Sequence, residues 1–262
     1  MASATQSDDV DRAIIIAAGM GSRLEHFTDE KPKCMVEIDG RSILSYQLEA
    51  LRSVGIDDIH IVRGYLADQL VVDGATYHEN PDYQDNNILL SLFCAESALE
   101  GGLITTYSDI VYTPEVVRRV VDSPHDIALV VDRQWSQAYE GRHDHPPAQA
   151  ELTRVDGDRV TKVGKQVGPD GSVGEFIGLA KYSARGAEIM RDVYRDVRAS
   201  VSDDEPFQAA ERFRKAYLTD LFMEIIDRGF DVGWVPIDGG WREIDTVQDL
   251  HRVRDEWPSS AG

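Results

Sequence analysis

The feature that most constrains this chain is a glycine-rich segment placed directly behind an apolar run near the N-terminus. Residues 13–16 predict a buried β-strand, and residues 17–24 then read A-A-G-M-G-S-R-L. Glycine lacks a Cβ, so Gly19 and Gly21 can adopt positive φ and direct backbone N–H groups at phosphate oxygens. The alternative is a plain strand and turn with basic residues nearby by chance. We predict that a nucleoside triphosphate is bound by Ala17, Ala18, Gly19, Met20, Gly21, Ser22, Arg23 and Lys33.

The spacing of these glycines differs from that of a P-loop and of a dinucleotide-binding G-x-G-x-x-G. Residues 31–44 read K-P-K-C-M-V-E-I-D-G-R-S-I-L, and the two segments together resemble the signature of nucleotidyltransferases that activate sugar phosphates and related small phosphates. Two further segments resemble the branch of phosphocholine and phosphonate cytidylyltransferases: Y-Q-D-N-N-I-L-L-S-L at 83–92 and W-R-E-I-D-T-V-Q-D-L at 241–250. Sugar-nucleotide members carry Q-x-x-G-T-A where this chain has Asn86, Asn87 and Ser91. The resemblance implies CTP as the nucleotide.

Apolar runs alternate with helical stretches along the 262 residues, as in an α/β protein. The resemblance implies a Rossmann-like three-layer nucleotidyltransferase fold with a mixed, mostly parallel central sheet. We expect a flexible acidic tail over residues 1–11 and one domain over 12–258, whose acceptor side is formed by about 132–183. The expected helices are 43–54, 88–96, 114–121, 184–198, 207–228 and one that begins after Thr246. The expected strands are 59–62, 103–107, 127–131, 176–182 and 232–237, with a hairpin around the turn 156–158 and a long loop over 133–147.

Two aspartates follow predicted strands and are candidate metal ligands. Asp109 comes directly after an apolar strand, and Asp245 lies before the N-cap of the last helix. The carboxyl edge of a parallel sheet is where ligands bind, and nucleotidyl transfer needs Mg²⁺ held by carboxylates and phosphate oxygens. An aspartate in this position is otherwise a turn former or a helix cap. By resemblance we assign Mg²⁺ to Asp109 and Asp245, and we leave Glu243 and Asp249 out of the metal site.

The chain shows no Ser/His/Asp or Cys/His arrangement, which fits an acceptor that is its own nucleophile. A phosphate monoester is largely dianionic near neutral pH and can attack the α-phosphorus directly. Positioning and charge neutralisation then supply most of the rate. By resemblance, Arg23 and Lys33 hold the triphosphate, and Lys165 approaches the acceptor phosphate. The alternative for Lys165 is a solvated lysine at the end of a strand.

The identity of the base and of the acceptor depends on two polar segments. The amides of Asn86 and Asn87, with Ser91 one helical turn later, can face the donor and acceptor edge of cytosine. The alternative is that the two asparagines turn the chain and cap a helix. In the loop, an ammonium would be caged by Asp132, Trp135 and Tyr139, whereas an anionic acceptor would be held by Arg133, Arg142, His143 and His145. We expect Arg133, Arg142, Lys165 and Glu175 to contact the acceptor, with a phosphonate slightly favoured over phosphocholine, unless the loop is simply exposed.

The charge balance excludes some partners. A net charge of −20 disfavours nucleic acid and anionic membranes, and no apolar run approaches the length of a membrane span. An acidic surface rich in Asp and Arg is explained either by adaptation to high salt or by a GC-rich genome. Two cysteines without metal spacing, and an N-terminus unlike a signal peptide, predict a cytoplasmic location. Apolar residues beyond one face of the helix expected at 207–228 suggest a homodimer contact, with core packing as the alternative.

The sequence therefore predicts a Mg²⁺-dependent cytidylyltransferase that joins CTP to a small phosphonate or phospho-alcohol and releases pyrophosphate. A sugar-1-phosphate nucleotidyltransferase is the alternative of the same class, weakened by the absent Q-x-x-G-T-A segment. An alternative of another class is a nucleotide-binding regulatory module without turnover. Against that module stands the joint presence of Arg23, Lys33, Asp109 and Asp245.

Overall fold

A computed structural model describes residues 9–257 of the chain. The tail expected at 1–11 therefore lies mostly outside the described residues. Residues 10 and 11 already belong to the first strand, β1 (Val10–Ala17). Within residues 9–257, no helix combines the length and the apolar character needed to cross a bilayer.

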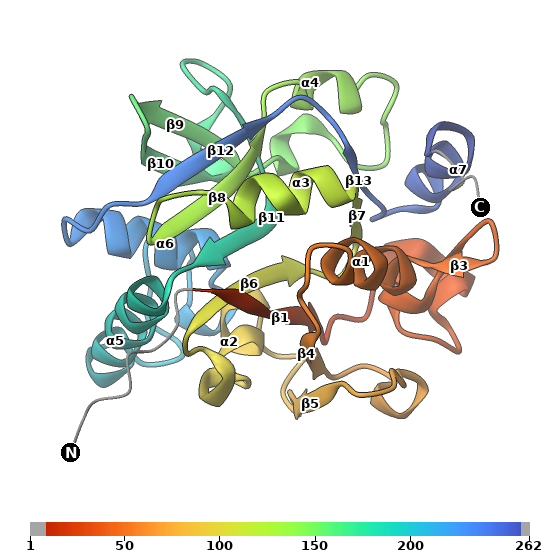
Figure 1. Cartoon of the computed structure of the whole chain (residues 1–262), viewed down its shortest axis with the longest axis horizontal. Helices are drawn as coiled ribbons and strands as arrows, with labels where there is room; N and C mark the ends of the chain where they lie inside the picture. The colour runs from red at the N-terminus through yellow and green to blue at the C-terminus, as the bar shows by residue number, and fades with distance from the viewer. Residues whose placement is uncertain (1–8, 258–262) are drawn as a thin grey trace.

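The centre of the molecule is a nine-stranded sheet in the order β5-β4-β1-β6-β11-β8-β12-β10-β9 (Figure 1). In this sheet β10 and β11 run against the direction of the other strands. The sheet is thus mixed and mostly parallel, as predicted. The strands after β1 are β4 (Asp58–Arg63), β5 (Thr76–Glu79), β6 (Gly102–Tyr107), β8 (Ile127–Asp132), β9 (Leu152–Asp156), β10 (Arg159–Gly164), β11 (Gly174–Tyr182) and β12 (Gly233–Ile237).

Helices cover both faces of the sheet because both faces of its strands are apolar. The helices are α1 (Ile43–Arg52), α2 (Ile88–Phe93), α3 (Pro114–Val121), α4 (Trp135–Ala138), α5 (Ala184–Ser200), α6 (Leu218–Asp227) and α7 (Val247–Glu256). In β1, Ala13 and Ile15 pack into the core under α1 and α3, while Ile14 and Ile16 pack into the core under α2, α5 and α6. Figure 1 shows α5 at the opposite end of the molecule from α7 and the C-terminus. The three-layer α/β prediction is confirmed.

A small antiparallel ribbon brings the C-terminal part of the chain to the end of β6. It consists of β7 (Ile110–Tyr112) and β13 (Trp241–Glu243), and the N–H of Ile244 donates to the carbonyl of Asp109 at 2.8 Å. A second ribbon pairs β2 (Glu37–Ile38) with β3 (Arg41–Ser42). Neither ribbon was predicted from the sequence. The pairing of β7 with β13 nevertheless brings Asp245 close to Asp109.

The prediction of a helix over residues 207–228 is wrong for its first half, because α6 begins only at Leu218. Tyr217 is extended, its N–H donates to Asp220 Oδ2 at 2.7 Å, and this capping box starts α6 at Leu218. Phe207 lies in the preceding loop and Phe213 begins a short 3-10 helix (Phe213–Lys215), and both pack into the same core as Phe222. The apolar residues that suggested a dimer contact are therefore largely buried within the chain itself. The helix expected at 88–96 likewise ends earlier, at Phe93, and the long loop over 133–147 contains the short α4.

We expect Gly178→Ala to destabilise the fold by about 2–4 kcal/mol, from backbone strain plus overpacking. Gly178 has a φ of 83°, and a Cβ there would lie 2.4 Å from the Tyr107 ring. Gly157→Ala is the matched control, because Gly157 has a φ of 61° but a methyl group there would meet no atom of residues 9–257 within 4 Å. In urea unfolding, Gly157→Ala should lose only the part of the unfolding free energy that comes from backbone strain. Equal losses in the two variants would contradict the packing argument.

Candidate active site

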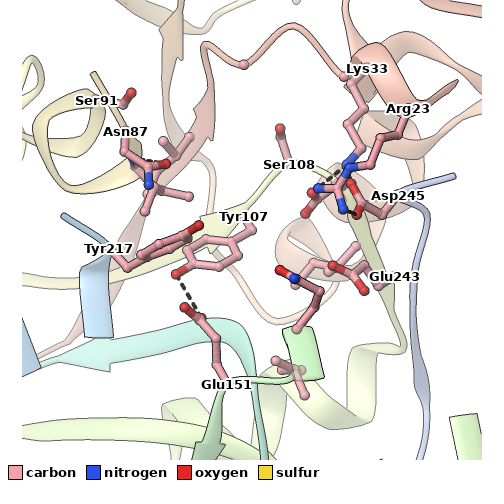
Figure 2. Close-up of a pocket in the computed structure, with 18 of the residues that line it drawn as sticks. Arg23, Lys33, Asn87, Ser91, Tyr107, Ser108, Glu151, Tyr217, Glu243 and Asp245 are labelled. Carbon is pink, nitrogen blue, oxygen red and sulfur yellow. Dashed lines mark hydrogen bonds and ion pairs between the residues drawn. The ribbon is translucent and has the colours of Figure 1, made fainter. Parts of the chain in front are cut away.

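A cavity of about 370 Å³ opens at the carboxyl ends of β1 and β6 (Figure 2). Its walls come from the glycine-rich loop, from the start of α2, from residues 107–110 after β6, and from β11 and β13. Thirteen of the predicted site residues line it together, which no single segment of sequence could show: Ala18, Gly19, Gly21, Ser22, Arg23, Lys33, Asn86, Asn87, Ser91, Asp109, Lys165, Glu175 and Asp245.

The glycine-rich loop is shaped by Gly21 rather than by both glycines. Gly21 has a φ of 63°, and a Cβ there would lie 2.8 Å from the Cβ of Lys33, so only glycine lets the two backbones approach so closely. Gly19 does not adopt positive φ, contrary to expectation, and its missing side chain leaves open space in the cavity wall. Ala17 is buried in the core and Met20 is exposed, and neither lines the cavity.

A charged centre joins the basic residues of the loop to the two aspartates. Lys33 Nζ lies 2.7 Å from both Asp109 Oδ2 and Asp245 Oδ1, and Arg23 lies 2.6 Å from Asp245 Oδ2. Burial opposes the charge of Lys33, but the two carboxylates outweigh it and raise the pKa of the ammonium. Burial likewise opposes the charge of Asp245, yet Lys33, the His145 hydrogen bond and Arg23 hold its pKa well below its usual range. Lys33 and Asp245 are therefore both ionised near neutral pH.

The same centre has the donor set of a divalent-cation site. Asp109 Oδ1 is buried and has no hydrogen-bond partner among residues 9–257, which leaves a carboxylate oxygen free beside Asp245. Carboxylate oxygens are the protein ligands that Mg²⁺ prefers. Asp109 and Asp245 therefore fit a magnesium ion and would be the residues that hold it.

The three residues predicted to read the base lie together, but their side chains also hold the local structure. Asn80 exchanges two hydrogen bonds of 2.9 Å with Asn86 and donates to Ser91 Oγ at 2.8 Å. Asn87 caps α2 by accepting from the N–H of Ile88, and its Nδ2 donates to the carbonyl of Lys215 at 2.9 Å. Figure 2 shows Asn87 and Ser91 on the same side of the cavity. The capping alternative is thus present in the structure, and base recognition remains a prediction.

Lys165 lines the cavity beside Tyr217 and Glu151. Its Nζ lies 3.2 Å from Tyr217 Oη and 4.2 Å from the centre of that ring, and it also donates to Gln149. Glu151 accepts from Tyr107 Oη at 3.2 Å (Figure 2). Burial raises the pKa of Glu151 to about 7, although Lys165 opposes this. Lys165 is thus held against a tyrosine in the cavity wall rather than solvated at a strand end.

Glu175 is a buried carboxyl group in the wall of the same cavity. Its Oε1 accepts from Tyr139 Oη at 2.7 Å, while its Oε2 is buried without a partner in the part of the chain that the structure describes. Burial, and then repulsion from Glu243, raise the pKa of Glu175 to about 8. An unpartnered carboxyl oxygen in a cavity wall is a ready acceptor for a cationic or hydroxylic ligand.

The structure places the two predicted acceptor-binding arginines outside the cavity. Arg133 is exposed and pairs with Asp238, with 2.9 Å between Nε and Oδ1. Arg142 is buried, and it binds Asp249 at 2.6 Å and Glu243 at 2.7 Å. Both side chains are therefore already neutralised by acids of the chain itself, and neither lines the cavity.

The residues considered for an ammonium cage are also engaged elsewhere. Asp132 accepts from Trp241 Nε1 at 2.8 Å, and Tyr139 is bound to Glu175. Sequence reasoning assigned no role to three residues that line the cavity, because their proximity arises only from the packing of β6, β9 and the start of α6: Tyr107, Glu151 and Tyr217.

Comparison with known proteins identifies the family. A family model described as a MobA-like NTP transferase domain matches residues 13–166. The chain belongs to this family. It is 32% identical to the CTP:phosphoglutamine cytidylyltransferase of Campylobacter jejuni, over 91% of this chain and 97% of that protein. It is 35% identical to the choline-phosphate cytidylyltransferase of Streptococcus pneumoniae, over 36% of this chain and 42% of that protein. The MobA-like chain is thus a nucleotidyltransferase, and its likeness to the cytidylyltransferase branch is confirmed.

Solved structures agree on the fold. The CTP:phosphocholine cytidylyltransferase of Streptococcus pneumoniae superposes with a TM-score of 0.70 over 94% of this chain and 98% of that one, at 23% identity. The inositol-1-phosphate CTP transferase of T. maritima gives a TM-score of 0.73 over 97% and 99%, at 21% identity. At these identities the superpositions establish the Rossmann-like nucleotidyltransferase architecture of the MobA-like chain.

Proposed function

We propose that this protein is a Mg²⁺-dependent cytidylyltransferase that transfers CMP from CTP to a small phosphonate or phosphate-monoester acceptor and releases pyrophosphate. The observation that carries the proposal is the contact of Lys33 with Asp109 and Asp245, directly beside the glycine-rich loop. The cations suited to a triphosphate and the carboxylates suited to a metal thus meet at one point of one cavity. The 32% identity with a CTP:phosphoglutamine cytidylyltransferase, over nearly the whole chain, supports CTP as the donor.

In this proposal the chain acts by positioning and by neutralising charge. Asp109 and Asp245 would hold Mg²⁺, which when bound polarises the α-phosphate and offsets negative charge. Arg23 and Lys33 bind the triphosphate, and Lys165 orients the acceptor phosphate from the cavity wall that it shares with Tyr217. The dianionic acceptor is its own nucleophile, so its oxygen attacks the α-phosphorus in line and pyrophosphate leaves. No side chain needs to act as a nucleophile.

We further propose that the acceptor carries a positively charged nitrogen. Glu151 and Glu175 are both buried in the cavity wall, and Glu175 Oε2 has no partner within residues 9–257. Arg133 and Arg142, which would favour a second anionic group, are bound to acids elsewhere. The named acceptors of similar enzymes include choline phosphate and 2-aminoethylphosphonate, both of which carry such a nitrogen. The two buried carboxyl groups, which a bound cation would ionise, and these relatives favour the same acceptor class.

The test is pyrophosphate release with Mg²⁺, at high and low salt, for CTP, UTP, dTTP, GTP and ATP. The acceptors are phosphocholine, phosphoglutamine, 2-aminoethylphosphonate, 2-hydroxyethylphosphonate and glucose-1-phosphate. We expect turnover with CTP and a nitrogen-bearing acceptor, and its loss in Asp109→Ala and Asp245→Ala. The aminoethyl and hydroxyethyl phosphonates differ at one group, so their ratio measures recognition of the amine. Turnover with glucose-1-phosphate and UTP or dTTP would contradict the proposal, as would nucleotide binding without any turnover.

A further inference from the structure

Asn80 lies directly behind the part of the cavity wall that is predicted to read the base. It follows β5 and is only 2% exposed, and its N–H donates to the carbonyl of Arg63 at the end of β4 at 2.7 Å. Asn86 and Ser91 line the cavity, whereas Asn80 does not. A buried amide that contacts both of these residues without reaching the cavity needs an explanation that the proposed mechanism does not supply.

The orientation of the Asn80 amide is set by the backbone. The N–H of Asp82 donates to Asn80 Oδ1 at 3.1 Å, and because a backbone N–H can only donate, the amide oxygen must lie on this side. The amide nitrogen then donates to Ser91 Oγ at 2.8 Å and to Asn86 Oδ1 at 2.9 Å, which uses both of its protons. Asn86 Nδ2 donates back to Asn80 Oδ1 at 2.9 Å. The Asn80 amide is thus fully hydrogen-bonded and cannot turn over without losing these bonds.

The contact with Asn80 determines what Ser91 can offer to a ligand. Because Ser91 Oγ accepts a hydrogen bond from Asn80, the hydroxyl proton of Ser91 must point away from Asn80. Within residues 9–257 that proton has no acceptor, and Ser91 is a residue of the cavity wall. Ser91 therefore presents a hydrogen-bond donor to the cavity, and Asn80 is the reason that it does so.

A donor in this wall distinguishes the pyrimidine bases. Ring nitrogen N3 of cytosine carries no proton and accepts a hydrogen bond, whereas N3 of uracil and of thymine carries a proton and donates. A serine proton directed at N3 therefore bonds to cytosine but opposes the N3 proton of the other two bases. In a site shielded from water, two donors that face each other both lose their hydrogen bonds, and the wrong base is rejected for that reason.

We propose that Asn80 is a positioning residue that makes this pocket select cytosine over uracil. It holds Ser91 Oγ as an acceptor and thereby turns the Ser91 proton toward N3 of the base. The inference rests on the proposed function only in placing the base of the nucleotide beside Ser91. It assigns the choice of base to a side chain that the base does not touch, through the fixed polarity of one hydrogen bond.

The test is Asn80→Asp, which keeps the shape of the side chain but leaves an ionised group that can only accept. Ser91 should then donate to the new carboxylate and turn a lone pair toward the cavity. We expect the ratio of kcat/KM for CTP to that for UTP to fall about 100-fold, about 10-fold from each nucleotide, while kcat at saturating CTP changes little. Gln84→Glu is the matched control, because Gln84 is exposed in the same segment and undergoes the same change of amide to carboxylate. An unchanged ratio in Asn80→Asp, or an equal loss for both nucleotides, would overturn the inference.

A second measurement uses the unaltered protein, in case Asn80→Asp fails to fold. In 3-deazacytidine triphosphate a C–H group replaces N3, so calorimetry without acceptor should show it binding at least about 10-fold more weakly than CTP. Equal affinity for the two nucleotides would overturn the inference. Preferential binding of CTP that depends on Asn80, without any CMP transfer, would overturn the proposed function and leave this inference standing. CMP transfer together with an unchanged preference in Asn80→Asp would overturn this inference alone.

Discussion

Replacing Lys33 by methionine is expected to lower kcat/KM about 10³-fold and to make the folded protein depend on a divalent cation. Lys33 is 8% exposed, and its ammonium lies 2.7 Å from each of two carboxylates. Methionine fills much of the same space without charge, so two acidic groups are left facing each other. Breaking a buried ion pair in this way costs about 3–5 kcal/mol of folding free energy.

The dependence on a cation separates this prediction from simple misfolding. Without the ammonium, Asp109 and Asp245 no longer have a positive side chain that competes with a metal, and they should bind a divalent cation more tightly. Mg²⁺ or Ca²⁺ should therefore raise the Tm of Lys33→Met more than that of the unaltered protein. Activity should stay low even in excess Mg²⁺, because the triphosphate has lost one of its two cations.

The control for Lys33→Met is Lys31→Met, two residues away. Lys31 is half-exposed and pairs with Glu37 at 3.2 Å on the surface, where such pairs contribute little. Its Tm and its response to Mg²⁺ should match those of the unaltered protein. Retained activity in Lys33→Met would contradict the role of Lys33 on the triphosphate, and a Tm that does not respond to divalent cations would contradict the assignment of Asp109 and Asp245 to a metal.

The part of the site that could be predicted from sequence is the part set by local chain geometry. The strand β1, the glycine-rich loop and Asp109 each follow from a few consecutive residues, because an apolar strand ends at a fixed edge of the sheet. The family resemblance added Asp245, which local pattern alone could not connect to Asp109. The connection is made by the three-residue strands β7 and β13, whose pairing leaves no pattern in either segment.

Side-chain partners were harder to predict than positions. The loop residue Arg142 was expected at the acceptor, but it is bound to Asp249, which lies on α7 far away in the sequence. Asn87 was expected to read the base, and it caps α2 as well. A charged or amide side chain binds whichever counterpart the tertiary structure brings near, and that choice is not encoded locally. Buried acids such as Glu151 were missed for the same reason.

Replacing Glu175 by glutamine is expected to weaken the binding of a nitrogen-bearing acceptor and to raise the stability of the folded protein. The buried Oε2 of Glu175 has no partner within residues 9–257, so a bound ammonium would favour the ionised carboxylate and pair with it. Glutamine keeps the shape and the contact with Tyr139 but carries no charge. We expect KM for 2-aminoethylphosphonate to rise about 10- to 100-fold, from the loss of a charge-assisted hydrogen bond. KM for 2-hydroxyethylphosphonate should change little, and an equal rise for both acceptors would contradict the role.

The stability half of this prediction has a definite dependence on pH. The pKa of Glu175 is about 8 in the folded chain, against about 4.3 when unfolded. The folded state therefore retains a proton that the unfolded state releases, and this group makes stability fall as pH rises from about 4.3 to about 8. Glu175→Gln removes that loss, so its advantage over the unaltered protein should grow across this window to about 1–3 kcal/mol. Urea unfolding from pH 5 to 8 measures it, and a variant less stable than the unaltered protein at pH 8 would show that Glu175 is ionised and satisfied in the free protein.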